Sequence, residues 1–188
     1  MLSFEIRNTT VHLLPLLMAF LIAVIGGVFH ARLLSKRNRD IVELCQAGKY
    51  NDSIVLAQKQ LNYYKRKLKT QNTKSVMERI YLHIAISYFG LSNDEQFIHN
   101  MTQVTDLNPE KHFWLALFYL TKDELDEFEK EYEILTSIRA NKKYLSYLSC
   151  MRESLEFDDV ETQTALSALK SILNFKLLQD ISQIITTG

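Results

Sequence analysis

The chain is poor in the two residues that make tight turns. It has 5 glycines and 2 prolines among 188 residues. A fold built from β-strands needs many tight turns, and such turns depend on glycine and proline. The scarcity therefore favours an all-α fold.

Cysteine is also scarce. Cys45 and Cys150 lie far apart, each within a helical pattern, which predicts two buried thiols in a reducing compartment and not a disulfide framework.

The sequence also lacks net charge and a catalytic motif. Lys and Arg together number 22, as do Asp and Glu, so no overall positive field points to nucleic acid. The 5 histidines form no metalloprotease motif, and the cysteines do not have metal-ligand spacing. No phosphate-binding loop, dinucleotide fingerprint or nucleophile elbow is present. We therefore predict that the protein is not an enzyme and has no metal, no cofactor and no nucleic-acid partner.

Acidic residues are missing from residues 11–34, and the first cation in that run is Arg32. About 20 helical residues cross the ~30 Å hydrocarbon layer of a bilayer, so this run is long enough to span it. A cleaved secretion signal has a positive leading segment, a shorter apolar core and a small-residue cleavage site. The sequence does not follow that pattern. We predict a retained transmembrane helix, with a cleaved signal or a buried core helix as the alternatives.

The cations around this run predict its orientation. Only Arg7 precedes the run, and four cations follow its apolar part: Arg32, Lys36, Arg37 and Arg39. Positively charged flanks stay on the cytoplasmic side of a membrane and attract anionic headgroups. We therefore predict that residues 1–10 lie outside the cytoplasm and that residues 35–188 form a cytoplasmic domain. Membrane lipid is then one expected partner.

A stripe of small residues runs along the predicted span. They recur at every fourth position: Ala19, Ala23, Gly27 and Ala31. Small side chains on one helix face allow two membrane helices to approach closely. The stripe predicts association of the span with itself or with another span, although Ala and Gly are also common in spans that face lipid.

Helix signals continue through the rest of the chain. Hydrophobic periodicity and capping residues predict helices at 40–47, 51–68, 74–90, 92–104, 109–120 and 121–138, followed by helices at 141–155, 160–173 and 175–185. The expected caps are Asn51 or Asp52, then Ser92, Asn108 and Thr121. Nothing between Val28 and Ala47 breaks a helix. The span is therefore expected to continue into the cytoplasmic domain as one helix.

Residues 40–138 contain helix pairs with recurring residue types. The stretch AGKYNDSI, residues 47–54, resembles the turn between the two helices of a tetratricopeptide repeat. Two further helix pairs carry family-like positions: Tyr81, Ile84, Ala85, Tyr88, Phe97, Met101 and Val104, closed by Leu107-Asn108-Pro109, and then Leu115, Ala116, Tyr119, Phe128, Tyr132 and Leu135. The turns are spaced irregularly, and another helical solenoid or bundle would share these signals. Residues 139–188 would then form capping helices.

The resemblance implies a concave face that binds a peptide or an amphipathic helix of another protein. The residues expected on that face are Arg79, Leu82, Ile86 and Phe89 from one helix, and Glu110, Phe113, Leu117 and Leu120 from the next. Alternatively, the C-terminal helix fills this groove with its own leucines. The expected function is a membrane-tethered adaptor that performs no catalysis. The other candidate is a structural subunit of a larger membrane complex, assembled through its span.

Overall fold

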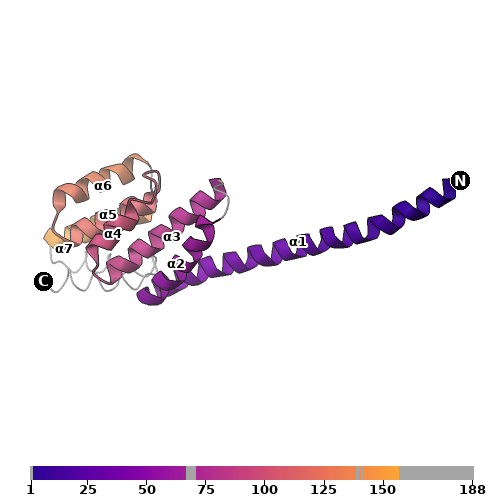
Figure 1. Ribbon diagram of the computed structural model, residues 1–188. Helices are drawn as coiled ribbons and strands as arrows, with labels where there is room; N and C mark the ends of the chain where they lie inside the picture. The colour runs from indigo at the N-terminus through magenta and orange to yellow at the C-terminus, as the bar shows by residue number, and fades with distance from the viewer. Residues whose placement is uncertain (1, 67–70, 139, 141, 157–188) are drawn as a thin grey trace. The chain divides into compact units, whose positions relative to one another are not determined.

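A computed structural model describes residues 2–66, 71–138, 140 and 142–156, and for residues 2–22, 30 and 154–156 it describes the backbone only. Within these residues all regular structure is helical, in seven helices and without a strand (Figure 1). The predicted all-α class is confirmed. The predicted helices at 160–173 and 175–185 lie outside the described residues.

The first helix, α1, spans Leu2–Gln46 without interruption. The prediction that no residue breaks the helix before Ala47 is confirmed. The chain divides into two units, Met1–Arg39 and Asp40–Gly188, so α1 contributes its last residues to the second unit. Among the residues with described side chains, no helix combines the length and the apolar character needed to span a bilayer. The predicted span includes residues 11–22 and 30, whose side chains lie outside the description.

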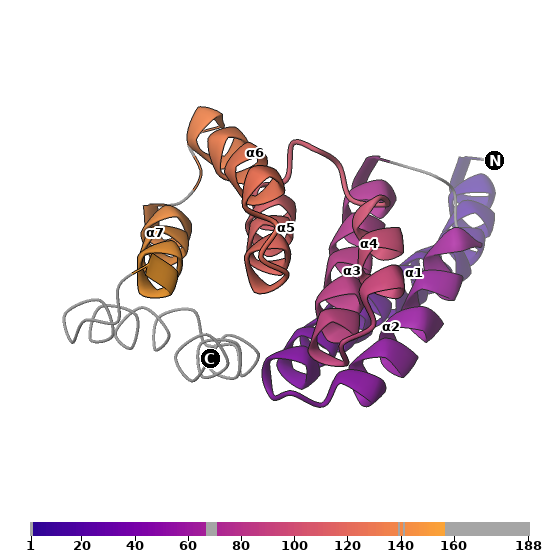
Figure 2. The same cartoon turned by 90° about the vertical axis from the view of Figure 1, so that its left-hand side faces the viewer.

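Six shorter helices build the second unit. They are α2 (Tyr50–Lys65), α3 (Gln71–Gly90), α4 (Asp94–Met101), α5 (Pro109–Thr121), α6 (Leu125–Ser137) and α7 (Lys142–Glu156). Helix α3 packs against α2 and α4, and α5 packs against α6 (Figure 2). The predicted helices match these to within a few residues at most ends. The largest difference is at α6, which begins at Leu125 and not at Thr121, and α3 begins at Gln71, earlier than the predicted residue 74.

Three hairpin turns share one backbone conformation. Gly48, Ser92 and Asp123 have positive φ angles of 73°, 55° and 59°. The residue after each of them donates its N–H to a carbonyl five residues earlier: Lys49 to Leu44 at 2.9 Å, Asn93 to Tyr88 at 2.9 Å and Glu124 to Tyr119 at 3.0 Å. This is the left-handed Schellman ending, which turns the chain sharply after a helix. The helical pairs of the second unit are therefore built on a repeated turn.

The shared turn corrects three predicted caps. A capping residue needs an extended or nearly extended backbone, but Ser92 is in the left-handed region, so Asn93 takes its place and accepts from the N–H of Gln96 at 3.1 Å. Thr121 ends α5, and its hydroxyl donates to the Phe118 carbonyl. The cap of α2 is Lys49, without a side-chain bond, in place of Asn51 or Asp52. The cap Asn108, followed by Pro109, is confirmed.

The core of the second unit consists of two clusters. The smaller one joins the end of α1 to α2 and α3: Ile41, Ala57, Leu61, Tyr64, Ile80 and Ile84. The larger one is aromatic at its centre, where the ring centroids of Phe97 and Phe118 are 4.7 Å apart and those of Phe89 and Phe97 are 5.1 Å apart. Tilted rings at such distances add to the energy gained by burying their area. The rings of α3, α4 and α5 therefore hold neighbouring hairpins together.

The two cysteines differ in burial. Cys45 is fully buried, as predicted, whereas Cys150 is only partly buried. Both are free thiols. Burial raises the pKa of Cys45 to about 11, so this thiol stays protonated at neutral pH and behaves as a small apolar side chain.

Candidate functional site

A cavity of about 200 Å³ lies where the first helices of successive hairpins meet. Its lining comes from four helices: Val42 and Gln46 of α1; Arg79, Leu82 and His83 of α3; Glu110, Phe113 and Trp114 of α5; and Tyr144 of α7. None of these residues belongs to the second helix of a pair, α2, α4 or α6. The cavity therefore lies on the side of the first helices, and we call it the inner cavity.

The inner cavity combines an apolar wall with opposite charges. Leu82, Phe113 and Trp114 are at most 3% exposed. Arg79 and Glu110 are exposed, so their charges are accessible to a ligand. Tyr144 stacks on Phe113 with ring centroids 4.6 Å apart. Burial, with the charge of Glu110 and a hydrogen bond to it, raises the pKa of Tyr144 to about 12, so this phenol keeps its proton and donates to the carboxylate.

His83 brings a polar atom without a partner to this cavity. Its Nδ1 is buried, and no described group forms a hydrogen bond with it. Burial lowers the pKa of His83 to about 4, with a smaller contribution from the charge of Arg79. The imidazole is therefore neutral at pH 7 and presents one donor and one acceptor nitrogen. An unsatisfied buried nitrogen costs stability unless a ligand or water pairs with it.

Most of the predicted partner-binding residues are buried in the core, and some of them line the inner cavity. Six of them are 0–8% exposed in the larger core cluster: Leu82, Ile86, Phe89, Phe113, Leu117 and Leu120. An open apolar groove lined by all of these side chains is therefore absent from the described structure, because neighbouring helices cover them. Arg79, Leu82 and Phe113 line the inner cavity, together with Glu110. Partner binding stays a prediction, and it now rests on these four residues.

The predicted groove omitted His83, Trp114 and Tyr144. Tyr144 belongs to α7, which was expected at 141–155 only as a capping helix. The ring of Tyr144 packs on that of Phe113 with centroids 4.6 Å apart, and the ring of Tyr147 lies near it with centroids 6.0 Å apart. Helix α7 thus covers part of the predicted groove. Treating α7 as the first helix of a further pair would have placed Tyr144 on the inner face.

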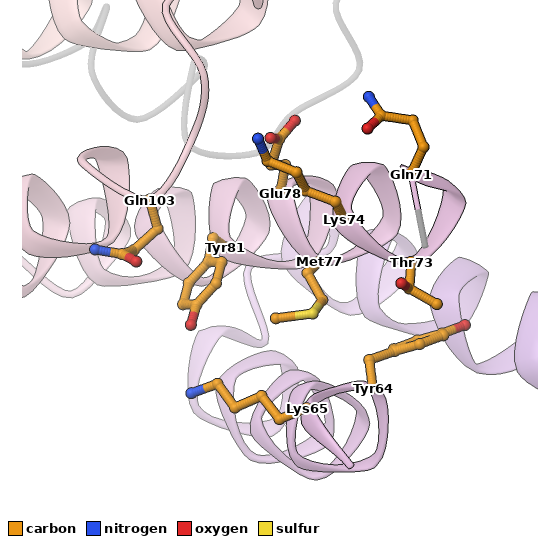
Figure 3. Close-up of a pocket in the computed structure, with 9 residues that line it drawn as sticks. All are labelled: Tyr64, Lys65, Gln71, Thr73, Lys74, Met77, Glu78, Tyr81 and Gln103. Carbon is orange, nitrogen blue, oxygen red and sulfur yellow. The ribbon is translucent and has the colours of Figure 1, made fainter. Parts of the chain in front are cut away.

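A second cavity, of about 600 Å³, lies between the end of α2 and the beginning of α3. Nine residues line it: Tyr64, Lys65, Gln71, Thr73, Lys74, Met77, Glu78, Tyr81 and Gln103. Figure 3 shows Met77 near its middle, with Tyr64 and Lys65 across from it on α2 and with Thr73 and Tyr81 on either side along α3. We call this the α2–α3 cavity.

A buried polar cluster ties α5 to α6 and to the loop before α5. His112 is 4% exposed, and its Nδ1 is 2.5 Å from a carboxylate oxygen of Glu131. Its Nε2 lies 2.7 Å from the carbonyl oxygen of Asp106. The neighbouring Lys111 donates to the Val104 carbonyl at 3.0 Å and forms an ion pair with Asp106. Lys111 and His112 of α5 therefore both hold the loop that precedes this helix. These contacts indicate a structural role for the two side chains.

Neither metal ligands nor known relatives indicate a function for the described part of the chain. No three His, Cys, Asp or Glu side chains converge to hold a metal ion among the residues with described positions. The chain was compared with models of protein families, with curated proteins and with solved structures, and none of them matches. The function proposed below therefore rests on the geometry of the two cavities and on the sequence.

Proposed function

We propose that the protein is a membrane-tethered adaptor that binds a segment of another protein at its inner cavity and performs no catalysis. The observation that carries the proposal is the inner cavity itself, which is lined only by first helices, with an accessible cation and an accessible carboxylate at its edge. A stack of helical hairpins uses its concave face to hold an extended or helical partner. An apolar side chain of the partner would enter between Arg79 and Glu110.

The repeated turns support a tetratricopeptide-like assignment for residues 40–138. Gly48, Ser92 and Asp123 share one conformation, and the residues that follow start the second helices in the same way. The fourth residue of each of these helices is buried: Ser53, Phe97 and Phe128. The family has a small residue at this position, so only the first pair follows its pattern closely.

The membrane tether in this proposal is the helical run 11–34. Where side chains are described, this run exposes apolar residues, for example Ile25 at 60% and Phe29 at 64%. Such exposure is unfavourable in water and favourable in lipid. The cations Arg32, Lys36, Arg37 and Arg39 are exposed after it. They support a cytoplasmic location for the hairpin domain. Tethering would raise the effective concentration of a bound partner near membrane targets.

The second candidate function is a structural subunit of a membrane complex, assembled through the span. The observation in its favour is the small-residue stripe. Ala23, Gly27 and Ala31 are exposed, and a Cβ added at Gly27 would meet no atom within 4 Å. This face could therefore receive another helix. Ala19, the first residue of the stripe, lies where side chains are not described.

The test is capture of partners by the full-length protein, cross-linked in membranes and then purified. Replacing Arg79 with Ala, or Glu110 with Gln, should lower the yield of a specific partner about tenfold, because a hydrogen bond to a charged group contributes ~1.5–3 kcal/mol. The matched controls are Lys59→Ala, an exposed cation of α2, and Glu95→Gln, an acid in the first turn of α4 as Glu110 is in α5. Both controls should capture as the unaltered protein does.

Two outcomes would reject the adaptor proposal. Equal capture by the Arg79 and Glu110 variants would show that the inner cavity does not bind the partner. Loss of all partners on replacing Ala23 and Gly27 with Leu, with the hairpin domain still folded, would favour the structural subunit. Release of the protein from membranes by alkaline carbonate would reject the tether in both.

A further inference from the structure

The α2–α3 cavity has the size and the mixed lining of a small-molecule site. Its volume of about 600 Å³ is within the ~300–1,000 Å³ of typical ligand pockets. Met77 and the rings of Tyr64 and Tyr81 supply apolar surface, and Figure 3 shows Met77 between those two rings. Gln71, Thr73 and Gln103 add groups that donate or accept hydrogen bonds. An amphiphile fits this lining better than a purely polar ion does.

The charged groups at this cavity favour an anion. Lys65 and Lys74 come from different helices, and both are exposed. Neither forms an ion pair with an acid among the described residues, and the Nζ of Lys65 lies 5.8 Å from the centre of the Tyr81 ring. The only acid in the lining is Glu78, one turn after Lys74 on α3. The two cations therefore exceed the acid charge at the cavity edge.

The two lysines of the cavity belong to a cation-rich part of the sequence. Six cations and no acid occur from Lys59 to Lys74, of which Lys67 and Lys69 lie outside the described residues: Lys59, Lys65, Arg66, Lys67, Lys69 and Lys74. Each cation near an anionic membrane adds to its attraction. Lys65 and Lys74 would attract an anionic lipid to the cavity, and the apolar lining would then select the lipid over a free anion.

We propose that the α2–α3 cavity binds the headgroup region of an anionic phospholipid. The phosphate contacts Lys65 and Lys74, and the glycerol and first methylenes pack on Met77, Tyr64 and Tyr81. The site is separate from the inner cavity. It rests on the proposed function only in that the membrane tether supplies the lipid, and it would hold the hairpin domain against the bilayer that carries it.

The experiment measures phospholipid retained by the full-length protein in dodecyl maltoside. Mixed micelles supply phosphatidylglycerol or phosphatidylcholine, and the retained lipid is quantified by mass spectrometry after gel filtration. The unaltered protein should retain more phosphatidylglycerol than phosphatidylcholine. Replacing Lys65 and Lys74 with Gln should weaken phosphatidylglycerol binding about fivefold for each lysine, the effect of one cation beside an anionic headgroup.

Two further variants separate the cavity from general charge and from phosphate alone. Lys59→Gln removes an exposed cation of α2 that is not part of the lining, and it should leave retention within about twofold. Met77→Gln keeps all charges and should lower phosphatidylglycerol retention several-fold. Thermal unfolding of each variant shows that the domain is still folded.

Four results would overturn the proposal. These are equal retention of the two lipids, no effect of the Lys65 and Lys74 changes, an equal effect of Lys59→Gln, and complete displacement of the lipid by inorganic phosphate at a similar concentration. A polyglutamate peptide that displaces the lipid would instead assign the site to an acidic protein segment. Because partner capture at the inner cavity is measured separately, failure of either proposal can be recognised without the other.

Discussion

The two units of this protein differ in the exposure of the same types of apolar side chain. In the hairpin domain Phe97 is fully buried and Ile86 is 1% exposed, whereas Phe29 and Ile25 of the first unit are 64% and 60% exposed. Both units are helical, so secondary structure does not explain the difference. Helices α2–α7 bury their apolar faces against one another, while residues 2–39 form a single helical segment. The comparison teaches that an exposed apolar helix face lacks the partner surface that the hairpin helices provide for one another, and under the proposed function lipid or another span would supply it.

The largest expected effect comes from truncating one phenylalanine in each unit. Phe97→Ala leaves a cavity beside Phe89 and Phe118 and should lower the free energy of unfolding of the hairpin domain by about 3–5 kcal/mol. Phe29→Ala should change it by less than about 0.5 kcal/mol. Urea unfolding of the full chain in detergent, followed by the fluorescence of its single tryptophan, Trp114, measures both. Equal losses would break the comparison between the units.

Within the hairpin domain, replacing a buried polar side chain should also cost more stability than replacing an exposed one. His112→Ala removes bonds to Glu131 and Asp106 and leaves the carboxylate of Glu131, which is 16% exposed, without this partner. We expect a loss of about 2–4 kcal/mol in the same unfolding measurement. The matched change His99→Ala alters an exposed histidine of α4 and should cost under about 0.5 kcal/mol. Similar values for the two would show that the cluster does not hold α5 to its neighbours.

Adding one methyl group to a glycine sharpens the contrast between the two units. At Gly90 a Cβ would lie 2.4 Å from a ring atom of Tyr50, so Gly90→Ala should destabilise the hairpin domain by about 1–3 kcal/mol. At Gly27 a Cβ meets nothing within 4 Å. Gly27→Ala should leave the domain unchanged and strengthen the first helix by up to about 1 kcal/mol. Thermal unfolding by circular dichroism distinguishes the two, and a stabilised Gly90 variant would contradict the packing.

The smallest expected effect depends on pH and concerns the inner cavity. The pKa of His83 is about 4 in the folded protein and 6.5 when exposed, so between these values the unfolded chain binds a proton that the folded chain does not. The resulting stability is therefore complete above about pH 6.5 and is lost as the pH falls toward 4. By about pH 5 the loss should reach at most ~2 kcal/mol.

Replacing His83 with Gln provides the control for this pH dependence, since carboxylates titrate alike in both proteins. The unfolding free energy of the unaltered protein minus that of the His83→Gln variant should fall as the pH is lowered from about 7 to 5, because only the unaltered protein carries this histidine. A constant difference across this range would show that His83 is not held neutral.

Much of the candidate site was accessible from the sequence, but its geometry was not. The resemblance to tetratricopeptide repeats placed Arg79, Leu82, Glu110 and Phe113 on the groove side of their helices, and the structure brings them to one cavity. The same reasoning treated Ile86 and Leu117 as accessible, although both are in the core. Periodicity finds an apolar face, but it does not show which neighbour covers that face.

The sequence by itself determined the helical class, most helix ends and the run of exposed apolar residues, because these depend on contacts within a few residues along the chain. Only the tertiary structure decided that Ser92 and Asp123 form left-handed turns, that α7 covers Phe113, and that His112 meets Glu131. His112 and Glu131 are 19 residues apart, and Phe113 and Tyr144 belong to different helices, α5 and α7. Such pairs depend on how helices distant in the sequence pack together, and the local sequence pattern does not contain that information.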